Sequence, residues 1–485
     1  MSTDIVLPDI VNVDFHRPIA ISAVSSNASI TPQTLFHSSR TTGAPYHRRD
    51  DSSVYLDDIP HVGRPTRCYV RIFALSLAQL TRSAPQPKCL SRYHAYTIIL
   101  LFRLYNSTGF SQQLLDILRI LRVPSWSQAA NHPVPCIQKV SGSFTNAVFF
   151  VSSPSTSSRT LLLRIYGPST DSLISRTREL QLLHVLSSRY KLGPRIYGTF
   201  TNGRLEEYFD SVTLTAVDIR EPRISAYIGA RMAELHGVDV TAIDGQSHGS
   251  NIKIGVCKNV HSWLPHARAV LALPAIAPAI RKELDLDRFH SKWESYMKWL
   301  KNQHIDSHPV LCHNDAQYGN ILRLNRVEEG TPEHHQIIVV DFEYASPNPA
   351  AFDIANHFHE WTANYHGPTP HVLDASRYPN RAERRTFLTA YLRNRTISTS
   401  TSTPTPAPAF SDSDPSPVVR ERELVALENA VCAWSPSTHA MWSVWALVQA
   451  RENVLAHVAR SEFDYVNYAC RRMAAFYREL ASLGV

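Results

Sequence analysis

The chain has 485 residues, 44% hydrophobic and 19% charged, which is enough for a two-lobed enzyme or for two or three domains with sizeable cores. Its net charge is +7, and residues 59–115 carry seven basic residues and no Asp or Glu. Because the remainder is balanced, the charge does not predict a nucleic-acid-binding face on the folded protein.

Cysteine usage and hydropathy predict the cellular setting. The seven cysteines include no Cys-x-x-Cys pair, which argues against a zinc or dithiol site and fits a reducing compartment. The first residues contain acids and no basic segment followed by an apolar one, so we expect neither secretion nor organelle import. The apolar run 96–102 is too short to cross a bilayer. A cytoplasmic protein without a transmembrane segment is therefore expected.

Residues 1–107 are rich in Ser, Thr, Pro and Arg and keep neither a helical nor a strand period. We expect this extension to be mostly disordered. The composition of residues 59–107 differs from everything downstream, and two interpretations stay open. The segment is either a basic tether or coding sequence outside the working protein. Peptides from residues 65–105 in the native protein would refute the second interpretation.

Residues 108–210 are predicted to form a small β-rich lobe. Residues 112–121 have helical spacing, and Val123-Pro124 ends that helix. Strands and one further helix should follow. The expected strands begin near Ile137 and cover 147–151, 161–167, 192–198 and 203–209, with a helix over 172–188. The turn between the first two strands contains small residues whose N–H groups can approach a phosphate, although an ordinary hairpin is the alternative.

From residue 211 onward the pattern is mainly helical. Helices are expected at 224–236, 259–272, 282–302 and 381–392, and the Ser/Thr/Pro-rich stretch 396–417 is expected to be a surface insertion that does not pack. Strands followed by helices predict an α+β, two-lobed fold with residues 211–485 as the large lobe.

Three polar side chains stand at notable positions in residues 308–361. Asp315 lies in a polar loop after a short apolar strand, Asn320 follows five residues later, and the apolar run 337–340 ends at Asp341. Oxygen ligands such as Asn320 and Asp341 suit Mg²⁺ that bridges a nucleotide, and Asp315 is then free to accept a proton from an attacking hydroxyl. Kinase-like folds have this order. An acidic loop that caps a helix or faces solvent is the alternative.

The segments His-Asn-Asp-Ala-Gln-Tyr-Gly-Asn (313–320), Val-Asp-Phe-Glu-Tyr-Ala (340–345) and Phe-Asp-Ile-Ala-Asn-His-Phe-His-Glu-Trp (352–361) closely resemble the choline/ethanolamine kinase family. The resemblance runs from about residue 114 to 485. It implies a protein-kinase-like fold and Mg²⁺-dependent transfer of the γ-phosphoryl group of ATP to choline, with ethanolamine a possible second substrate. It also implies the first step of the CDP-choline route to phosphatidylcholine, and a homodimer.

The resemblance further implies the nucleotide site. Residues 141–146 resemble the family's Ser-Gly-Gly-Leu-Thr-Asn-like loop, with Ser143 and Phe144 where Gly and Leu are usual. Arg164 on a strand and Glu179 on the next helix resemble the pair that steadies the phosphates, although a surface pairing of the arginine with another acid is the alternative. Glu343 would share the metal or its water. The ATP-binding candidates are Ser141, Gly142, Ser143, Thr145, Asn146, Arg164, Glu179 and Glu207, the last at a predicted hinge.

The C-terminal region carries an aromatic group that could hold an ammonium ion. Ser435-Pro436 is predicted to cap a helix on which Trp442 and Trp445 share one face, and Phe463, Tyr465 and Tyr468 follow. Each good contact with an ammonium is worth about 0.5–2 kcal/mol, although core packing is the alternative. By resemblance, the substrate residues are Gln317, Tyr344, Glu360, Tyr365, Trp442, Trp445 and Tyr468, with Glu360 supplying the complementary negative charge.

His313, His357 and His359 share no helical spacing, so we expect them to orient the backbone and pack rather than bind metal. Two other functions are considered. One is an ethanolamine-preferring, small-alcohol or aminoglycoside-type phosphotransferase. The other is an inactive pseudokinase that serves as a binding module, against which Asp315, Asn320 and Asp341 argue.

Overall fold

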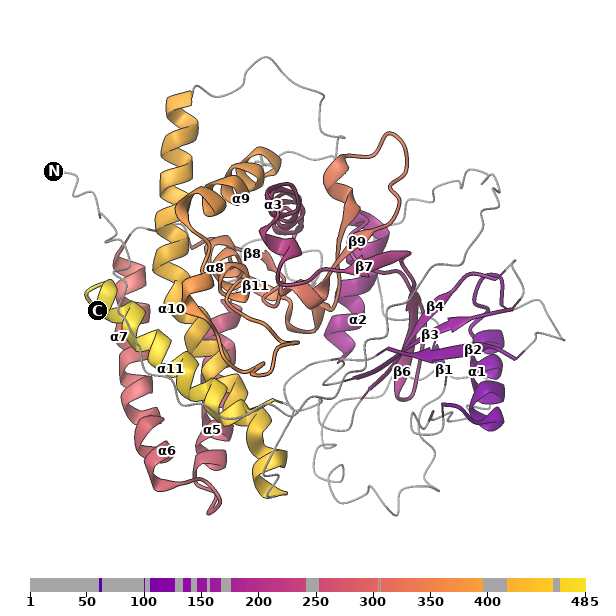
Figure 1. The fold of residues 1–485 in the computed structure, drawn as a ribbon, viewed down its shortest axis with the longest axis horizontal. Coiled ribbons are helices and arrows are strands. Elements are labelled where there is room, and N and C mark those ends of the chain that lie inside the picture. The colour runs from indigo at the N-terminus through magenta and orange to yellow at the C-terminus, as the bar shows by residue number, and fades with distance from the viewer. Residues whose placement is uncertain are drawn as a thin grey trace, which may run out of the picture. The chain divides into compact units, whose positions relative to one another are not determined.

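The chain's computed structural model begins with a six-stranded sheet (Figure 1). The structure describes residues 61–62, 100, 105–126, 134–140, 146–154, 158–166, 176–240, 253–303, 305, 307–395, 417–456 and 463–485. The strand order is β1-β5-β6-β4-β3-β2, and each pair of neighbours is antiparallel except β1 with β5. The strands are β1 (His61–Val62), β2 (Cys136–Lys139), β3 (Asn146–Ser152), β4 (Leu161–Tyr166), β5 (Ile196–Phe200) and β6 (Gly203–Glu207).

The five strands predicted in residues 137–209 are all present. β5 begins at Ile196 rather than at residue 192, because Gly193 has a φ of +69° and the ring of Pro194 then restricts the backbone further. The predicted helix after β4 is α2 (Arg176–Val185), which continues as one π-helical turn, Leu186–Tyr190.

Helix α1 (Thr108–Ile120) packs on the sheet through its apolar face. The Ser107 side chain caps it by accepting a hydrogen bond from the N–H of Phe110. Leu100 is fully buried in the same core, and its N–H and C=O bond to the Asn202 side chain at 3.1 and 2.8 Å. Leu100 and β1 therefore belong to the folded part, although both lie in the extension expected to be mostly disordered. The rest of residues 1–104 lies outside the described residues.

The helical part follows residue 210. Its helices are α3 (Pro222–His236), α5 (Gly255–Leu271), α6 (Pro278–Glu283), α7 (Leu286–Asn302), α8 (Ala350–Glu360), α9 (Arg381–Asn394), α10 (Pro417–Leu455) and α11 (Tyr465–Ser482). Helix α10 packs against α5, α8 and α11 (Figure 1). No helix among the described residues is both long and apolar enough to cross a membrane.

Two helix boundaries differ from prediction. The single helix expected over 282–302 is split into α6 and α7, because the Asp285 side chain accepts the N–H groups of Asp287 and Arg288 and starts a new helix. Ser435-Pro436 does not cap a helix, because α10 runs through it. The proline cannot donate to the preceding turn, and nearby hydroxyls bond to main-chain carbonyls, for example Thr438 to that of Ser435.

Small sheets hold the loops of residues 308–361. Strand β8 (Pro309–Cys312) pairs with β11 (Ser346–Pro349), and β9 (Ile321–Leu324) pairs with both β7 (Ser211–Thr213) and β10 (Ile337–Val339). The loop between β8 and β9 and the segment between β10 and β11 therefore connect the same two small sheets.

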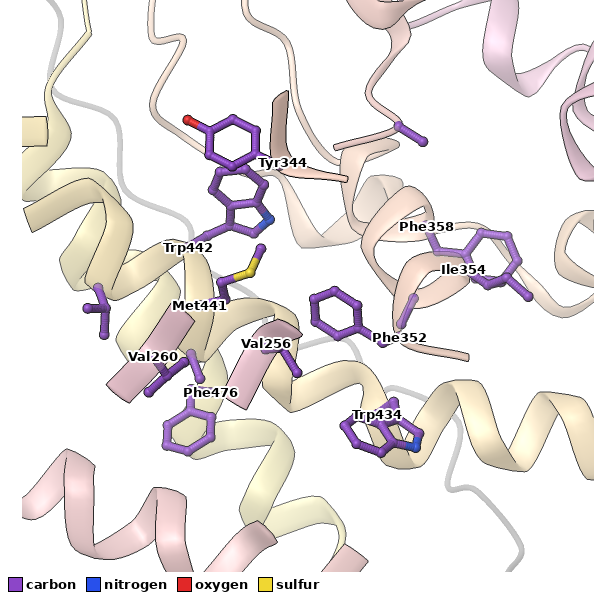
Figure 2. Packing of buried hydrophobic residues seen from close by; sticks show 14 of the residues in the cluster. Val256, Val260, Tyr344, Phe352, Ile354, Phe358, Trp434, Met441, Trp442 and Phe476 are labelled. Atoms are coloured by element: carbon purple, nitrogen blue, oxygen red, sulfur yellow. The ribbon is translucent and has the colours of Figure 1, made fainter. Parts of the chain in front are cut away.

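An apolar core lies behind these loops. Val256 and Val260 of α5, Phe352 and Ile354 of α8, and Met441 of α10 belong to this core, and Figure 2 shows the Phe352 ring pointing toward Val256 and Met441. The ring of Tyr344 lies against Trp442 at the edge of the same cluster, with ring centroids 5.5 Å apart. The core thus supports the aromatic residues as well as the loops.

Candidate active site

A buried histidine ties the loop after β8 to the strand that delivers Asp341. The N–H of Asp315 donates to His313 Nδ1 at 3.2 Å, so the proton of this ring is on Nε2, which donates to the Val340 carbonyl at 3.0 Å. Burial lowers the pKa of His313, which keeps the ring neutral. This histidine orients the backbone, as predicted.

Asp353 of α8 holds the same loop from the other side. Its side chain is fully buried and accepts the N–H groups of His313 and Asn314 at 2.8 and 2.7 Å, together with His236 Nε2 at 3.1 Å. Burial alone would raise its pKa, but His236 and His313 hold the pKa of Asp353 below its usual value. The aspartate is thus an ionised anchor for the loop that carries Asp315.

Two non-glycine residues of the site have left-handed backbone conformations, Asn314 with φ 66° and Asp341 with φ 68°. Such residues are uncommon and are often found where the surrounding structure imposes them. Asn314 is held by its side chain, whose Nδ2 donates to the Tyr344 carbonyl at 2.9 Å and whose Oδ1 accepts from Asn348 Nδ2 at 2.8 Å. The backbone around Asp315 is therefore well defined.

The three predicted polar residues converge. Asn320 Nδ2 donates to the carbonyl and the carboxylate Oδ2 of Asp315, both at 2.9 Å, which leaves its own carbonyl oxygen for another partner. Asp341 Oδ2 accepts from Arg164 Nη1 at 3.1 Å. Asp341 Oδ1 is buried and has no hydrogen-bond partner among the described residues. Two oxygens from different loops thus remain available near Asp315.

These residues line a cavity of about 190 Å³. It brings together Asp315, the predicted metal residues and all seven predicted substrate residues, and it adds Phe463 and Tyr465. Its lining is Asp315, Gln317, Asn320, Asp341, Glu343, Tyr344, Glu360, Tyr365, Trp442, Trp445, Phe463, Tyr465 and Tyr468. One wall is acidic and the other is aromatic.

Four carboxylates share the cavity, and their pKa values reflect the crowding. Burial, with Glu360 and Asp341 nearby, raises the pKa of Asp315 well above its usual range. Burial and Asp341 raise the pKa of Glu343 to about 7. Burial would also raise that of Asp341, but Arg164 and Arg204 hold it below the usual value. Arginines pair with three of these four carboxylates, and a bound cation would relieve the repulsion that remains around Asp315.

The predicted ion pair between Arg164 and Glu179 is wrong in detail. Arg164 pairs with Asp341 at 3.1 Å and Glu206 at 3.4 Å, while Glu179 pairs with Arg204 at 2.8 Å and Arg176 at 2.9 Å. Arg204 also pairs with Glu206. Arg204 and Arg164 sit opposite each other on β6 and β4, so Arg204 lies between the expected partners and takes Glu179. Strand β4 and helix α2 are therefore linked through a network of ion pairs instead of a single pair.

The aromatic wall is a set of edge-to-face and tilted ring contacts. The rings of Trp442 and Trp445 are 5.1 Å apart at 84°, and Trp445 meets Tyr465 at 5.8 Å and 67°. Phe463 contacts Tyr468 at 5.2 Å. Trp442 is also buried in the core, so packing and cavity lining are not alternatives for this residue.

The remaining ATP-binding candidates are only partly visible. Ser141, Gly142, Ser143 and Thr145 lie outside the described residues, and of Asn146 only the backbone, paired with Tyr166, is described. Glu207 does not line the cavity. Its Oε2 accepts the N–H of Arg195 at 3.2 Å, which ties the end of β6 to β5.

Sequence reasoning missed several residues that build the site. Asp353 and Asn356 lie in the segment 352–361 but were given no role, and an acid and an amide between apolar helix positions were the available signal. Asn356 accepts from Trp442 Nε1 at 2.7 Å and donates to the Asn314 carbonyl at 3.0 Å. Arg472 had no comparable signal, because arginines on a helix usually face solvent.

Comparison with known proteins gives one consistent result. The family model described as choline/ethanolamine kinase matches residues 137–477. Choline kinase of Schizosaccharomyces pombe is 32% identical over 419 residues, which cover 78% of this chain and 90% of that protein. Choline/ethanolamine kinase of Homo sapiens is 29% identical over 72% of this chain and 80% of that protein.

Solved structures show the same fold. Choline kinase from Cryptosporidium parvum Iowa II superposes with a TM-score of 0.57 at 21% identity, over 77% of this chain and 97% of that one. Plasmodium vivax ethanolamine kinase also gives 0.57, at 23% identity, over 75% and 88%. The predicted α+β fold, with a β-rich part followed by a large helical part, is confirmed.

Proposed function

The chain belongs to the choline/ethanolamine kinase family, and we propose that it transfers the γ-phosphoryl group of ATP to choline. The observation that carries the proposal is the two-sided cavity, in which Asp315 stands among acidic groups on one side and aromatic rings on the other. An alcohol with a cationic end fits this division, because the ring faces can take the cation while the hydroxyl lies toward Asp315.

In this proposal Asp315 accepts the proton of the alcohol. Its raised pKa makes it a stronger base than an exposed aspartate, and the bonds from Asn320 Nδ2 and to His313 fix its position. Arg164, already bound to Asp341, would contact the phosphates with its remaining donors. Most of the rate would come from positioning and charge neutralisation.

The acidic side of the cavity fits a hard divalent cation. Asp341 Oδ1 is buried without a partner among the described residues, and the Asn320 carbonyl oxygen is left available by the bonds of its amide nitrogen. Glu343, which pairs with Arg176 at 3.4 Å, would add a third oxygen ligand. These residues would hold Mg²⁺, whose positive charge would offset the negative charge of the ATP phosphates.

Divalent cations should stabilise the protein more at pH 8 than at pH 6. The pKa of Glu343 is raised from its ordinary 4.5 to about 7, so the folded state resists its ionisation. Glu343 therefore does not affect the free energy of unfolding at a pH below its pKa of 4.5 in the unfolded chain. Between that pH and the pKa of about 7 in the folded protein, the free energy of unfolding falls as pH rises. A bound cation relieves this loss only where the carboxylate is charged. Melting temperatures at both pH values, with and without Mg²⁺ together with a non-hydrolysable ATP analogue, would measure the stabilisation at each pH.

Glu343→Gln is the matched control for that experiment. It keeps the shape of the side chain and removes the titrating group, so the gain in melting temperature should become less dependent on pH. Equal gains at both pH values in the parent protein would contradict the assignment of Glu343 to the cation site.

A coupled ATP-consumption assay with a panel of amino alcohols tests the proposed function. We expect turnover with choline and weaker turnover with ethanolamine. Preference for ethanolamine or for an unrelated alcohol would favour the phosphotransferase alternative. No ATP consumption with any alcohol, in a folded protein that binds ATP, would favour the pseudokinase alternative.

Family membership also supports the wider setting. We propose a cytoplasmic enzyme at the first step of the CDP-choline route to phosphatidylcholine, acting as a homodimer. Light scattering of the purified full-length protein should give about twice the chain mass of 54.6 kDa, and a monomer mass at working concentration would contradict the dimer.

A further inference from the structure

Arg472 of α11 is a fully buried arginine that the proposed phosphoryl transfer does not use. It lies directly behind the aromatic wall. Its Nη2 pairs with Glu360 Oε1 at 3.2 Å, and its Nε donates to the Tyr468 hydroxyl at 2.9 Å. The guanidinium carbon also lies 5.0 Å from the centre of the Tyr468 ring. Arg472 thus contacts two residues of the cavity without lining it.

A second layer fixes the orientation of Arg472. Its Nη1 lies 3.2 Å from His439 Nδ1, and because arginine can only donate, the proton of this imidazole is on Nε2. That nitrogen lies 3.3 Å from Glu479 Oε1. The chain from Glu479 through His439 to Arg472 therefore explains why the guanidinium points at Glu360.

Glu360 is consequently not a free counter-ion. Its Oε1 is paired with Arg472, and its Oε2 accepts the hydroxyl of Tyr365 at 2.5 Å. The carboxylate is almost completely buried. Burial raises its pKa, and Arg472 and Tyr365 oppose that rise. Its negative charge is largely balanced from within the protein.

The polar ends of the neighbouring aromatic residues are also engaged. Trp442 Nε1 donates to Asn356 Oδ1 at 2.7 Å, and Trp445 Nε1 donates to the Tyr344 hydroxyl at 2.9 Å. The Tyr468 hydroxyl accepts from Arg472. The polar atoms of these three residues are therefore bound to other protein groups, and what they offer to a ligand is their ring faces.

We propose that Arg472 is a positioning residue that makes the cavity select a quaternary over a primary ammonium. By engaging Glu360, it withdraws the acceptor that a primary ammonium needs, and it keeps the aromatic faces as the main binding surface. A quaternary ammonium has no N–H to satisfy, whereas a primary ammonium has three donors that lose water on entry. The inference rests on the proposed function and adds to it a reason for selectivity.

The test is the ratio of kcat/KM for choline to that for ethanolamine in Arg472→Gln. Glutamine removes the charge and the fork of donors, so Glu360 Oε1 loses its arginine partner and becomes available to a primary ammonium. One charge-assisted hydrogen bond to the primary ammonium is worth about tenfold, and the ratio should fall by about that factor. The ratio of the two dissociation constants should fall in parallel.

A matched control is available at the residue immediately before Arg472. Arg471 is exposed, lies on the same helix and binds Asn467 Oδ1 at 2.9 Å. It does not contact Glu360. Arg471→Gln makes the same chemical change outside the cavity, and it should leave both ratios unchanged.

Tyr365→Phe provides a second route if Arg472→Gln does not fold. It frees Glu360 Oε2 without leaving an unpaired charge, so it should lower the ratio in the same direction. A ratio that stays at the parental value in the folded variants overturns the inference, as does a parent enzyme that uses both alcohols equally well. Both outcomes leave phosphoryl transfer intact, whereas a parent that phosphorylates neither alcohol contradicts the proposed function itself.

Discussion

Asp315→Asn should lower kcat by about a thousandfold and leave the affinity for ATP nearly unchanged. Asparagine has almost the same shape and can still accept the bond from Asn320 Nδ2, but it cannot take the proton of the alcohol. Steady-state kinetics and calorimetric binding of a non-hydrolysable ATP analogue would measure the two quantities. A variant that keeps more than a tenth of the parental activity would contradict the role of Asp315 as the base.

Thermal unfolding of the same variant separates catalysis from stability. The pKa of Asp315 is raised well above its usual range by burial and by neighbouring acids, so its ionisation costs the folded state free energy. Asn at this position removes that cost, and the melting temperature should be unchanged or higher. A clear loss of stability would indicate that Asp315 mainly holds the loop.

Asp353→Asn is the informative contrast, because this buried aspartate holds the loop and does not line the cavity. Its carboxylate accepts two backbone N–H groups and His236. Loss of its charge should lower the free energy of unfolding by about 2 kcal/mol, the worth of a hydrogen bond to a charged group. Asp315→Asn should therefore lower turnover, whereas Asp353→Asn should lower stability.

The proposed catalytic residues could be predicted to lie together because their signals are local in the sequence. Asp315 and Asn320 lie five residues apart in one loop, and Asp341 ends an apolar strand, so the two nearby segments needed only adjacent strands to bring them together. The aromatic wall was recognised in the same way, from Trp442 and Trp445 three residues apart on one helix. Most strands and helices were predicted correctly for the same reason, because hydrophobic periodicity is also a local signal.

The predictions that were wrong or missing depend on contacts between distant segments, or on which of two residues binds a shared partner. Arg164 and Glu179 were paired by analogy, but Arg204, from the strand beside Arg164, takes Glu179. Ser435-Pro436 has the composition of a helix start, yet packing of α10 against α5, α8 and α11 keeps the helix continuous. Arg472 binds Glu360 across more than a hundred residues, a relation that neither period nor spacing reveals.

Trp445→Ala should raise the KM for choline by about thirtyfold and change kcat little. A desolvated cation–π contact is worth about 2 kcal/mol, which corresponds to that factor. Trp445 suits this test better than Trp442, because the Trp442 indole also binds Asn356, which in turn binds the Asn314 carbonyl of the loop between β8 and β9. Substitution of Trp442 would therefore disturb the loop, and its effect on KM could not be read alone.

Two further substitutions distinguish the ring face from simple apolar contact. Trp445→Phe keeps a π face and loses the bond to the Tyr344 hydroxyl, so the KM for choline should rise only a few-fold. Trp445→Leu keeps apolar bulk without a π face, and its KM should approach that of the alanine variant. If leucine serves as well as phenylalanine, the wall binds choline as an apolar surface, and an unchanged KM in all three variants would mean that Trp445 only packs the core.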